Sequence, residues 1–138
     1  MRNGKSLRRR IKARAAAKGV RFSLSTHALK QMLAEDNCPA CGAELVDEPA
    51  HPHEASVDRI IPQLGYTDEN TAILCRTCNG RKSDMDIVRL RANGLEYLAE
   101  WTETLCIQRG LPRTVTLRMK IRRRLAFLFR KVADFIEV

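Results

Sequence analysis

The sequence predicts an α+β domain: a short antiparallel β-hairpin braced by a metal-binding cysteine cluster and flanked by basic helices. Three observations lead to this class. The chain has 138 residues, which suits a single domain. Two short segments rich in β-branched residues are set among longer segments with helical periodicity. Four of the five cysteines occur as two C-x-x-C pairs, a spacing typical of a metal site.

Basic residues are concentrated at the two ends of the chain. The formal net charge is +9 and the sequence pI about 9.8. Residues 1–21 hold nine Lys and Arg and no acid, and so do residues 109–131, whereas residues 22–108 hold seven basic residues against fourteen acids. Clustered Lys and Arg release counter-ions from a polyanion. The pattern favours an acidic centre with two phosphate-binding arms, and the alternative is two solvated helix faces.

The first arm is expected to be a basic helix over residues 2–18, either stable alone or formed on a bound polyanion, and Gly19 ends it. A second helix is expected to begin at Ser25 or Thr26, because both side chains can cap a helix. It should end near residues 36–37. Its apolar side chains share one face; they are Leu29, Met32 and Leu33.

The middle of the chain predicts a knuckle followed by the hairpin. Residues 38–42 form a tight turn, and residues 47–54 form a loop that contains two prolines and two histidines. Residues 56–61 and 71–74 are the two strands, and they are expected to pair antiparallel across a broad loop with Gly65 as its pivot.

Helices are expected to complete the chain. A short helix follows Cys75 and runs towards Lys82. Another, capped by Ser83 or Asp84, should continue to about Thr104, although Gly94 weakens it. After a break at Gly110 and Pro112, a last helix carries an apolar stripe at steps of three and four. The stripe consists of Leu117, Ile121, Leu125, Leu128, Val132 and Phe135.

The cysteine pairs are the strongest chemical signal in the chain. Cys38 and Cys41 form one knuckle and Cys75 and Cys78 the other, with 33 residues between the two knuckles. Four thiolates converging on one tetrahedral ion favour structural zinc over magnesium or manganese. The alternative is a chance or redox pairing. Cys106 stands alone between apolar residues and is expected to be a buried structural cysteine.

Several motifs in order resemble the zinc-containing branch of the HNH endonuclease family. They are CPACG at 38–42, SVDRIIP at 56–62, Asn70, and LCRTCNGRKSD at 74–84. Together they cover about a third of the chain. The resemblance implies a ββα-metal core, in which the hairpin and the following helix hold one catalytic divalent ion and the cysteines serve as scaffold. An Asp-Arg-Ile motif with Gly65-Tyr66 in the loop is similar to a phage-like subgroup.

The resemblance assigns roles residue by residue. Asp58 and Asn79 would supply the ligands of the catalytic ion, and two oxygen ligands favour Mg²⁺ or Mn²⁺. Asn70 would fix the hairpin loop. Lys82, one turn beyond Asn79, would meet phosphate. Further DNA contacts are expected from the basic side chains of two segments; they are Arg81 and the run Arg8, Arg9 and Arg10.

One position departs from the family pattern. The strand usually reads Asp-His, with the histidine as general base, but here Arg59 follows Asp58. Arginine stays protonated and cannot accept the proton. Three explanations stay open. His53 or His51 could act as base; hydroxide held by the metal could attack while Arg59 clamps the phosphate; or the domain binds without catalysis.

These observations predict a division into a basic arm at 1–21, a nuclease domain at 22–104 and a basic amphipathic helix at 105–138. The expected activity is hydrolysis of phosphodiester bonds in DNA by an endonuclease or nickase. The alternative is a non-catalytic zinc module that binds DNA or docks on a larger nucleoprotein complex. The last helix can pack on the core or form a homodimer. We expect no secretory signal and no membrane partner, and a location in the cytoplasm of a bacterial or phage-infected cell.

Overall fold

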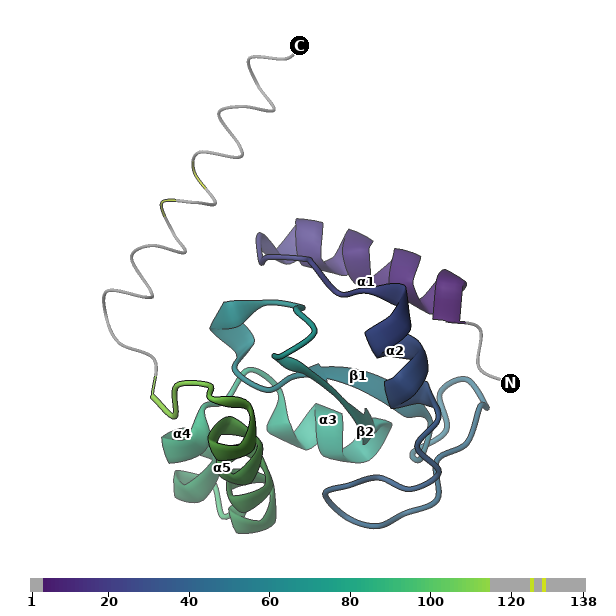
Figure 1. The fold of residues 1–138 in the computed structure, drawn as a ribbon. Helices are drawn as coiled ribbons and strands as arrows, with labels where there is room; N and C mark the ends of the chain where they lie inside the picture. Colours follow the sequence, from purple (N-terminus) through teal and green to yellow (C-terminus); the bar gives the residue numbers. More distant parts are fainter. Residues whose placement is uncertain (1–3, 115–124, 126–127, 129–138) are drawn as a thin grey trace.

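The computed structural model describes residues 4–114, 125 and 128. Within them the chain forms a small mixed domain with one two-stranded antiparallel sheet, which confirms the α+β class and the hairpin (Figure 1). The elements are α1 (Gly4–Lys18), α2 (Thr26–Leu33), β1 (Ala55–Arg59), the 3₁₀ turn η1 (Pro62–Leu64), β2 (Thr71–Cys75), α3 (Arg76–Lys82), α4 (Ile87–Ala92) and α5 (Glu96–Arg109).

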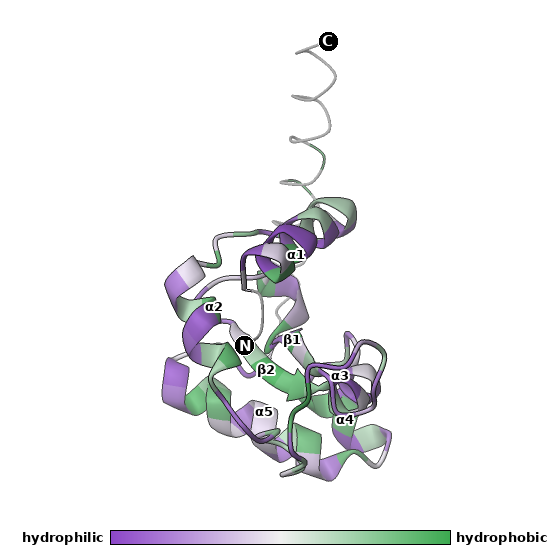
Figure 2. Ribbon diagram, turned by 90° about the vertical axis from the view of Figure 1, so that its right-hand side faces the viewer, coloured by the Kyte–Doolittle hydropathy of each residue, from purple (hydrophilic) through white to green (hydrophobic). Residues whose placement is uncertain are grey.

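The hairpin lies at the centre of the domain. Its register runs from the pair Ala55–Cys75 to the pair Arg59–Thr71. All five residues of β2 are buried, and the strand is coloured apolar over most of its length in Figure 2. Helices α2 and α3 both contact β2, so neither face of the strand is left to water. This double covering explains why β2 is a nearly continuous apolar run.

Helix α1 packs on the core through Ile11 and Ala15, which are both buried. It contacts α2, and Gly19 ends it with a φ of 63°, as the sequence predicts. The Arg8 side chain also holds α1 to the segment that precedes α2, because its Nε donates to the Leu24 carbonyl oxygen at 2.9 Å. Residues 4–18 therefore share one core with the hairpin.

The loop between the strands is tied to the segment that follows α1. Tyr66 N donates to Arg21 O, and Ser23 N donates to Tyr66 O, both at 2.8 Å. Gly65 makes this approach possible: its φ is 76°, and a Cβ there would collide with the Arg21 backbone. The expected pivot at Gly65 is confirmed, and it is enforced both by backbone conformation and by lack of space.

Two capping signals can be compared with the structure. Ser25 is the N-cap of α2, since its Oγ accepts from Ala28 N at 3.0 Å. The expected single helix from residue 83 or 84 to 104 is wrong, because α4 and α5 are separate. Asp86 caps α4, and Gly94 has a φ of 72°, a left-handed conformation that ends a helix at little cost only for glycine. Helix α5 then continues beyond the expected end, to Arg109.

The predicted last helix and the homodimer through it lie outside the described residues, except for Leu125 and Leu128, whose side chains are exposed. Gly110, with a φ of 64°, ends α5, so the expected break after that helix is confirmed. No helix in the described part of the chain combines the length and apolar character needed to cross a membrane.

Candidate functional site

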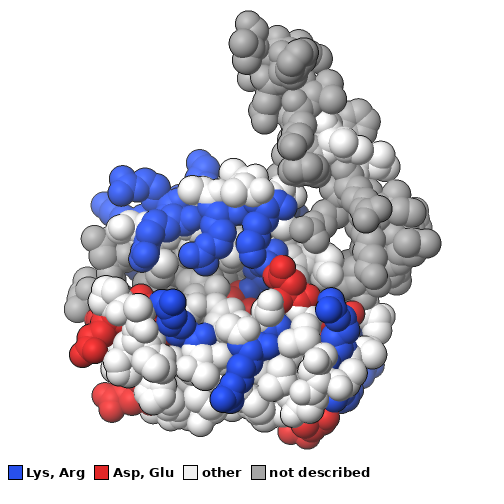
Figure 3. All heavy atoms as spheres, turned by 180° about the vertical axis from the view of Figure 1, so that it is seen from behind, with Lys and Arg blue, Asp and Glu red and all other residues white. Residues whose placement is uncertain are grey.

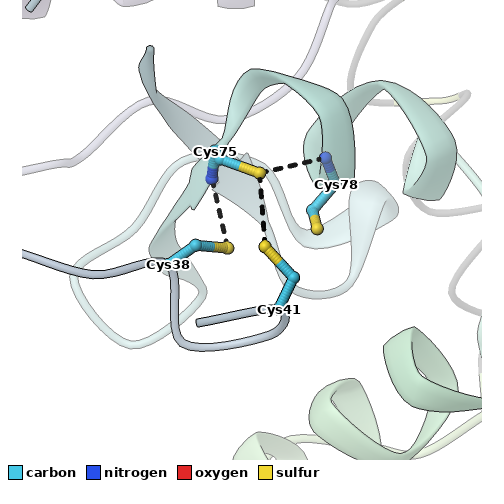
Figure 4. A group of neighbouring side chains, drawn as sticks. All are labelled: Cys38, Cys41, Cys75 and Cys78. Carbon is cyan, nitrogen blue, oxygen red and sulfur yellow. Dashed lines mark hydrogen bonds between the residues drawn. The ribbon is translucent and has the colours of Figure 1, made fainter. Parts of the chain in front are cut away.

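Four cysteine sulfurs converge at one end of the hairpin, as the paired spacing predicts (Figure 4). Cys38 and Cys41 come from the turn after α2, Cys75 ends β2, and Cys78 lies in the first turn of α3. Their Sγ atoms all lie within 4.8 Å of one another, and the Cys41 and Cys75 sulfurs are 3.8 Å apart. Four sulfurs bound tetrahedrally to zinc are separated by about 3.8 Å, so the cluster fits a structural zinc ion.

Backbone N–H groups are aimed at the sulfurs. Cys75 N donates to Cys38 Sγ at 3.3 Å, and Cys78 N donates to Cys75 Sγ at 3.4 Å. Burial opposes the thiolate of Cys38, but hydrogen bonds from the backbone of Cys75, Cys41 and Ala40 outweigh it, and the pKa of Cys38 is lowered. For Cys78 burial dominates and raises the pKa. A bound cation would hold all four groups as thiolates. Cys106, apart from this cluster, is buried in α5.

A second polar centre lies at the other end of the hairpin, where Asp58 and Asn79 line the same hollow of about 300 Å³. We call it the Asp58 hollow. Strand β1 and helix α3 form its floor, and α1 overhangs it. Its other lining residues are Arg14, Lys18, Ser56, Val57, Arg59, Tyr66, Arg76, Gly80, Ser83 and Asp84. The structure therefore brings the two expected oxygen ligands to one concave site.

The Asp58 carboxylate is 3% exposed and paired with Lys82, which is fully buried. Lys82 Nζ donates to Asp58 Oδ1 at 3.2 Å and to Arg59 O at 2.8 Å. Oδ2 lies 3.0 Å from the same nitrogen but accepts no well-directed hydrogen bond. Burial raises the pKa of Asp58 to about 6, although the charge of Lys82 opposes the rise.

Lys82 thus occupies a different position from the one that the resemblance implies. A fully buried ammonium cannot reach a phosphate at the surface, because its donors point at Asp58 and the backbone inside the protein. Lys82 is the last residue of α3, and the helix places its side chain against β1, where it contacts Asp58. Its function in the structure is that of an internal counter-ion.

Asn79 is held by its amide nitrogen. Nδ2 donates to Ser56 Oγ and to Val57 O, the latter at 3.2 Å. Both acceptors belong to β1, so the carboxamide is fixed against the strand that carries Asp58. Since the nitrogen makes both contacts, the carboxamide oxygen remains available as a ligand.

The Arg59 guanidinium makes its polar contacts with other residues of the protein. It is 7% exposed, its Nη1 donates to Pro62 O at 3.0 Å, and its Nη2 pairs with Asp84 at 2.5 Å. The guanidinium also lies over the Tyr66 ring, 5.5 Å from its centroid. These contacts close the loop after β1 and connect it to the end of α3, although Arg59 still forms part of the wall of the hollow.

Asn70 fixes the hairpin loop, as expected. Its Nδ2 donates to Ile61 O at 2.8 Å and to Gly65 O at 2.7 Å, and its Oδ1 accepts from Ile61 N at 2.9 Å. The side chain is buried. It therefore replaces backbone pairing where the loop departs from β1.

Other predicted site residues lie away from the hollow. His53 is exposed in the loop before β1, with its ring 5.5 Å from that of His51, and neither lines the hollow. Arg81 is exposed and donates to the Tyr97 hydroxyl at 3.4 Å. Arg9 and Arg10 are exposed on α1, whereas Arg8 is partly buried. The base function of His53 and His51 stays a prediction.

Sequence reasoning missed Asp84, Arg14 and Lys18. The sequence indicates Asp84 as a helix cap and as the last residue of the motif at 74–84, whereas in the structure it is the ion-pair partner of Arg59. Arg14 and Lys18 follow Arg10 at steps of four, a spacing that places all three along one side of a helix. That signal was present in the sequence, but without the fold nothing indicated which side of α1 faces the hairpin.

Comparison with protein-family models, curated proteins and solved structures found no match for this chain.

Proposed function

We propose that this protein is a metal-dependent DNA endonuclease or nickase that hydrolyses phosphodiester bonds at the Asp58 hollow. The observation that supports it is the meeting of Asp58 and Asn79 at one concave site, on a hairpin braced by the cysteine cluster. The same residues carry the resemblance to the HNH family in the sequence.

The donors suit a hard divalent cation. Asp58 Oδ2 is a buried oxygen that accepts no hydrogen bond, although Lys82 Nζ lies 3.0 Å from it, and the Asn79 carboxamide contacts β1 through its nitrogen, which leaves its oxygen unused in those contacts. Carboxylate and amide oxygens are ligands that Mg²⁺ and Mn²⁺ accept, with water completing the shell. A cation bound by these two residues would supply a Lewis acid for the scissile phosphate and its leaving oxygen.

The chain's own residues would prepare the site. Lys82 holds Asp58 through Oδ1, so that the carboxylate keeps one orientation. Ser56 and Val57 hold Asn79. Arg59 fixes the loop wall through Asp84. Such preorganisation removes the cost of arranging the groups during the reaction.

A specific observation favours a second candidate, a non-catalytic zinc module that binds DNA. The Asp58 carboxylate already has a cationic partner in Lys82, and the residue next to it is Arg59 rather than a base. If this ion pair satisfies Asp58 permanently, the hollow would bind phosphate without cleaving it. The two candidates differ in turnover and not in DNA affinity.

Nicking of supercoiled plasmid in Mg²⁺ or Mn²⁺ tests the proposal. We expect wild type to nick, and Asn79→Ala and Asp58→Asn to lose at least about 100-fold in rate, since the first removes an expected cation ligand and the second removes the negative charge of the other. Glu100→Ala is the control, because Glu100 is exposed on α5, lies outside the hollow and is not an expected DNA contact; its rate should be unchanged.

The outcomes separate the candidates. No nicking by folded, zinc-loaded wild type that still binds DNA would leave the non-catalytic module. Equal nicking by wild type and both ligand variants would indicate a contaminant and reject the nuclease. His53→Ala tests the base: a large loss of rate supports the histidine, whereas an unchanged rate removes it.

A further inference from the structure

The Asp58 hollow opens into a longer groove. A second hollow of about 780 Å³ adjoins it, and the two share four lining residues: Arg14, Ser56, Val57 and Arg76. We call the combined space the α1 groove. Its floor is the outer face of β1, one wall is α1, and the opposite wall contains the loop before β1 and the start of α3. Asp58 and Asn79 lie at one end.

One wall of the groove carries a regular row of cations. Arg10 lines the larger hollow, Arg14 lines both, and Lys18 lines the Asp58 hollow. They are four residues apart on α1, so their Cα atoms follow one another at about 6 Å along the helix axis. All three are exposed. Figure 3 shows Lys and Arg gathered along the upper part of one face, where α1 lies, with others below them.

The other charges of the groove are largely paired within the protein. Of the acidic side chains that line the groove, Glu54 pairs with Arg76 at 3.5 Å, Asp84 with Arg59, and Asp58 with Lys82, and Asp47 lines the larger hollow beside them. By contrast, in the described part of the chain the row on α1 makes no ion pair. These three side chains are therefore available to bind an anion in the groove, and they follow one another along the axis of α1.

We propose that Arg10, Arg14 and Lys18 bind successive phosphates of one DNA strand, which runs along α1 and delivers a phosphodiester to the Asp58–Asn79 end. The position of the delivered bond rests on the proposed function, but the binding of the strand does not. A linear row in a recess suits a chain of regularly spaced phosphates, whereas a flat anionic membrane could not reach into it. Contacts of this kind give affinity without sequence choice.

Two triple variants of the full chain test the row. Arg10→Ala/Arg14→Ala/Lys18→Ala removes the groove charges. The matched control, Lys5→Ala/Lys12→Ala/Lys30→Ala, removes the same charge from α1 and the neighbouring α2, outside the groove. Its three residues are exposed and do not line either hollow. Alanine preserves helix propensity in both, and circular dichroism and zinc content verify the fold.

Binding is measured by fluorescence anisotropy of a labelled DNA duplex and single strand, at several salt concentrations and without Mg²⁺ or Mn²⁺, so that no cleavage is required. Loss of three phosphate contacts should raise the Kd roughly 100-fold at 0.1 M salt and make the salt slope shallower by about 3. The control triple should raise the Kd less than about threefold.

Three results would overturn the proposal: an equal loss in both triples, which would mean that only net charge matters; displacement of DNA by polyglutamate at equal charge concentration; or tighter binding to RNA of the same sequence. Nicking distinguishes this inference from the nuclease proposal. Wild type that binds through the groove but does not nick would refute the nuclease alone. If wild type nicks plasmid but the two triple variants bind DNA with the same affinity, the groove proposal is refuted and the nuclease proposal is not.

Discussion

The hairpin carries a polar centre at each end, and the two centres differ in the source of the cation that would balance their anionic side chains. At the Ala55–Cys75 end, four sulfurs converge and are contacted by backbone N–H groups and the Tyr97 hydroxyl. At the Arg59–Thr71 end, Asp58 is paired with a cation from the chain itself, Lys82. The first centre should therefore depend on an external ion for folding, whereas the second should be stable without one.

The largest expected effect is at the cysteine end. Cys38→Ser should abolish zinc binding and unfold the domain, because structural zinc contributes about 10 kcal/mol or more to folding. Circular dichroism and zinc content measure both losses. Cys106→Ala, a buried cysteine outside the cluster, should keep its zinc. A native melting curve in zinc-free Cys38→Ser would contradict the zinc interpretation.

The next largest effect is expected from breaking the buried ion pair between Lys82 and Asp58. Lys82→Met should lower the free energy of unfolding by about 3–5 kcal/mol, because it leaves the Asp58 carboxylate buried without its partner. Urea denaturation measures the change. Arg81→Met, on the exposed side of the same helix, should cost less than about 0.5 kcal/mol. Adding Asp58→Asn to Lys82→Met should recover much of the loss, and the absence of recovery would show that packing of Lys82 matters more than its charge.

Asn70 and Asn79 should also differ in how much each contributes to the stability of the fold. Asn70→Ala should cost about 2–3 kcal/mol, since it leaves the backbone groups of Ile61 and Gly65 without partners in a buried loop. Asn79→Ala loses contacts at a partly buried position and should cost less than half as much. Thermal denaturation compares them, and similar costs would mean that Asn79 is also a structural residue.

The smallest effect is the pH dependence of Asp58. Its pKa in the folded protein is about 6, above the ordinary 3.8, so between these values the folded state binds more protons than the unfolded state. The contribution is fully present below the ordinary pKa and is lost as the pH rises through 6. Relative to Asp58→Asn, wild type should gain about 1 kcal/mol between pH 7 and pH 5. A flat difference in urea titrations would contradict the raised pKa.

Local signals predicted much of this architecture. The cap of Ser25, the end of α1 at Gly19 and the extended character of each strand depend on residues within a few positions of one another, so the sequence shows these signals directly. The paired cysteines can be recognised in the sequence for the same reason: each knuckle brings two ligands together within one turn. The same local reasoning failed at Gly94, where a tolerated glycine and a helix-ending glycine look alike until φ is known.

The sequence by itself determined the α+β class, the cysteine cluster and the resemblance that links Asp58 with Asn79. Only the tertiary structure decided that Lys82 is buried against Asp58, 24 positions away in the chain, that Arg59 pairs with Asp84, and that Arg10, Arg14 and Lys18 face a groove. The physical reason is that the partner of a charge, and hence its availability to a ligand, depends on which surfaces the core brings together. Residue type and spacing along the chain do not contain that information.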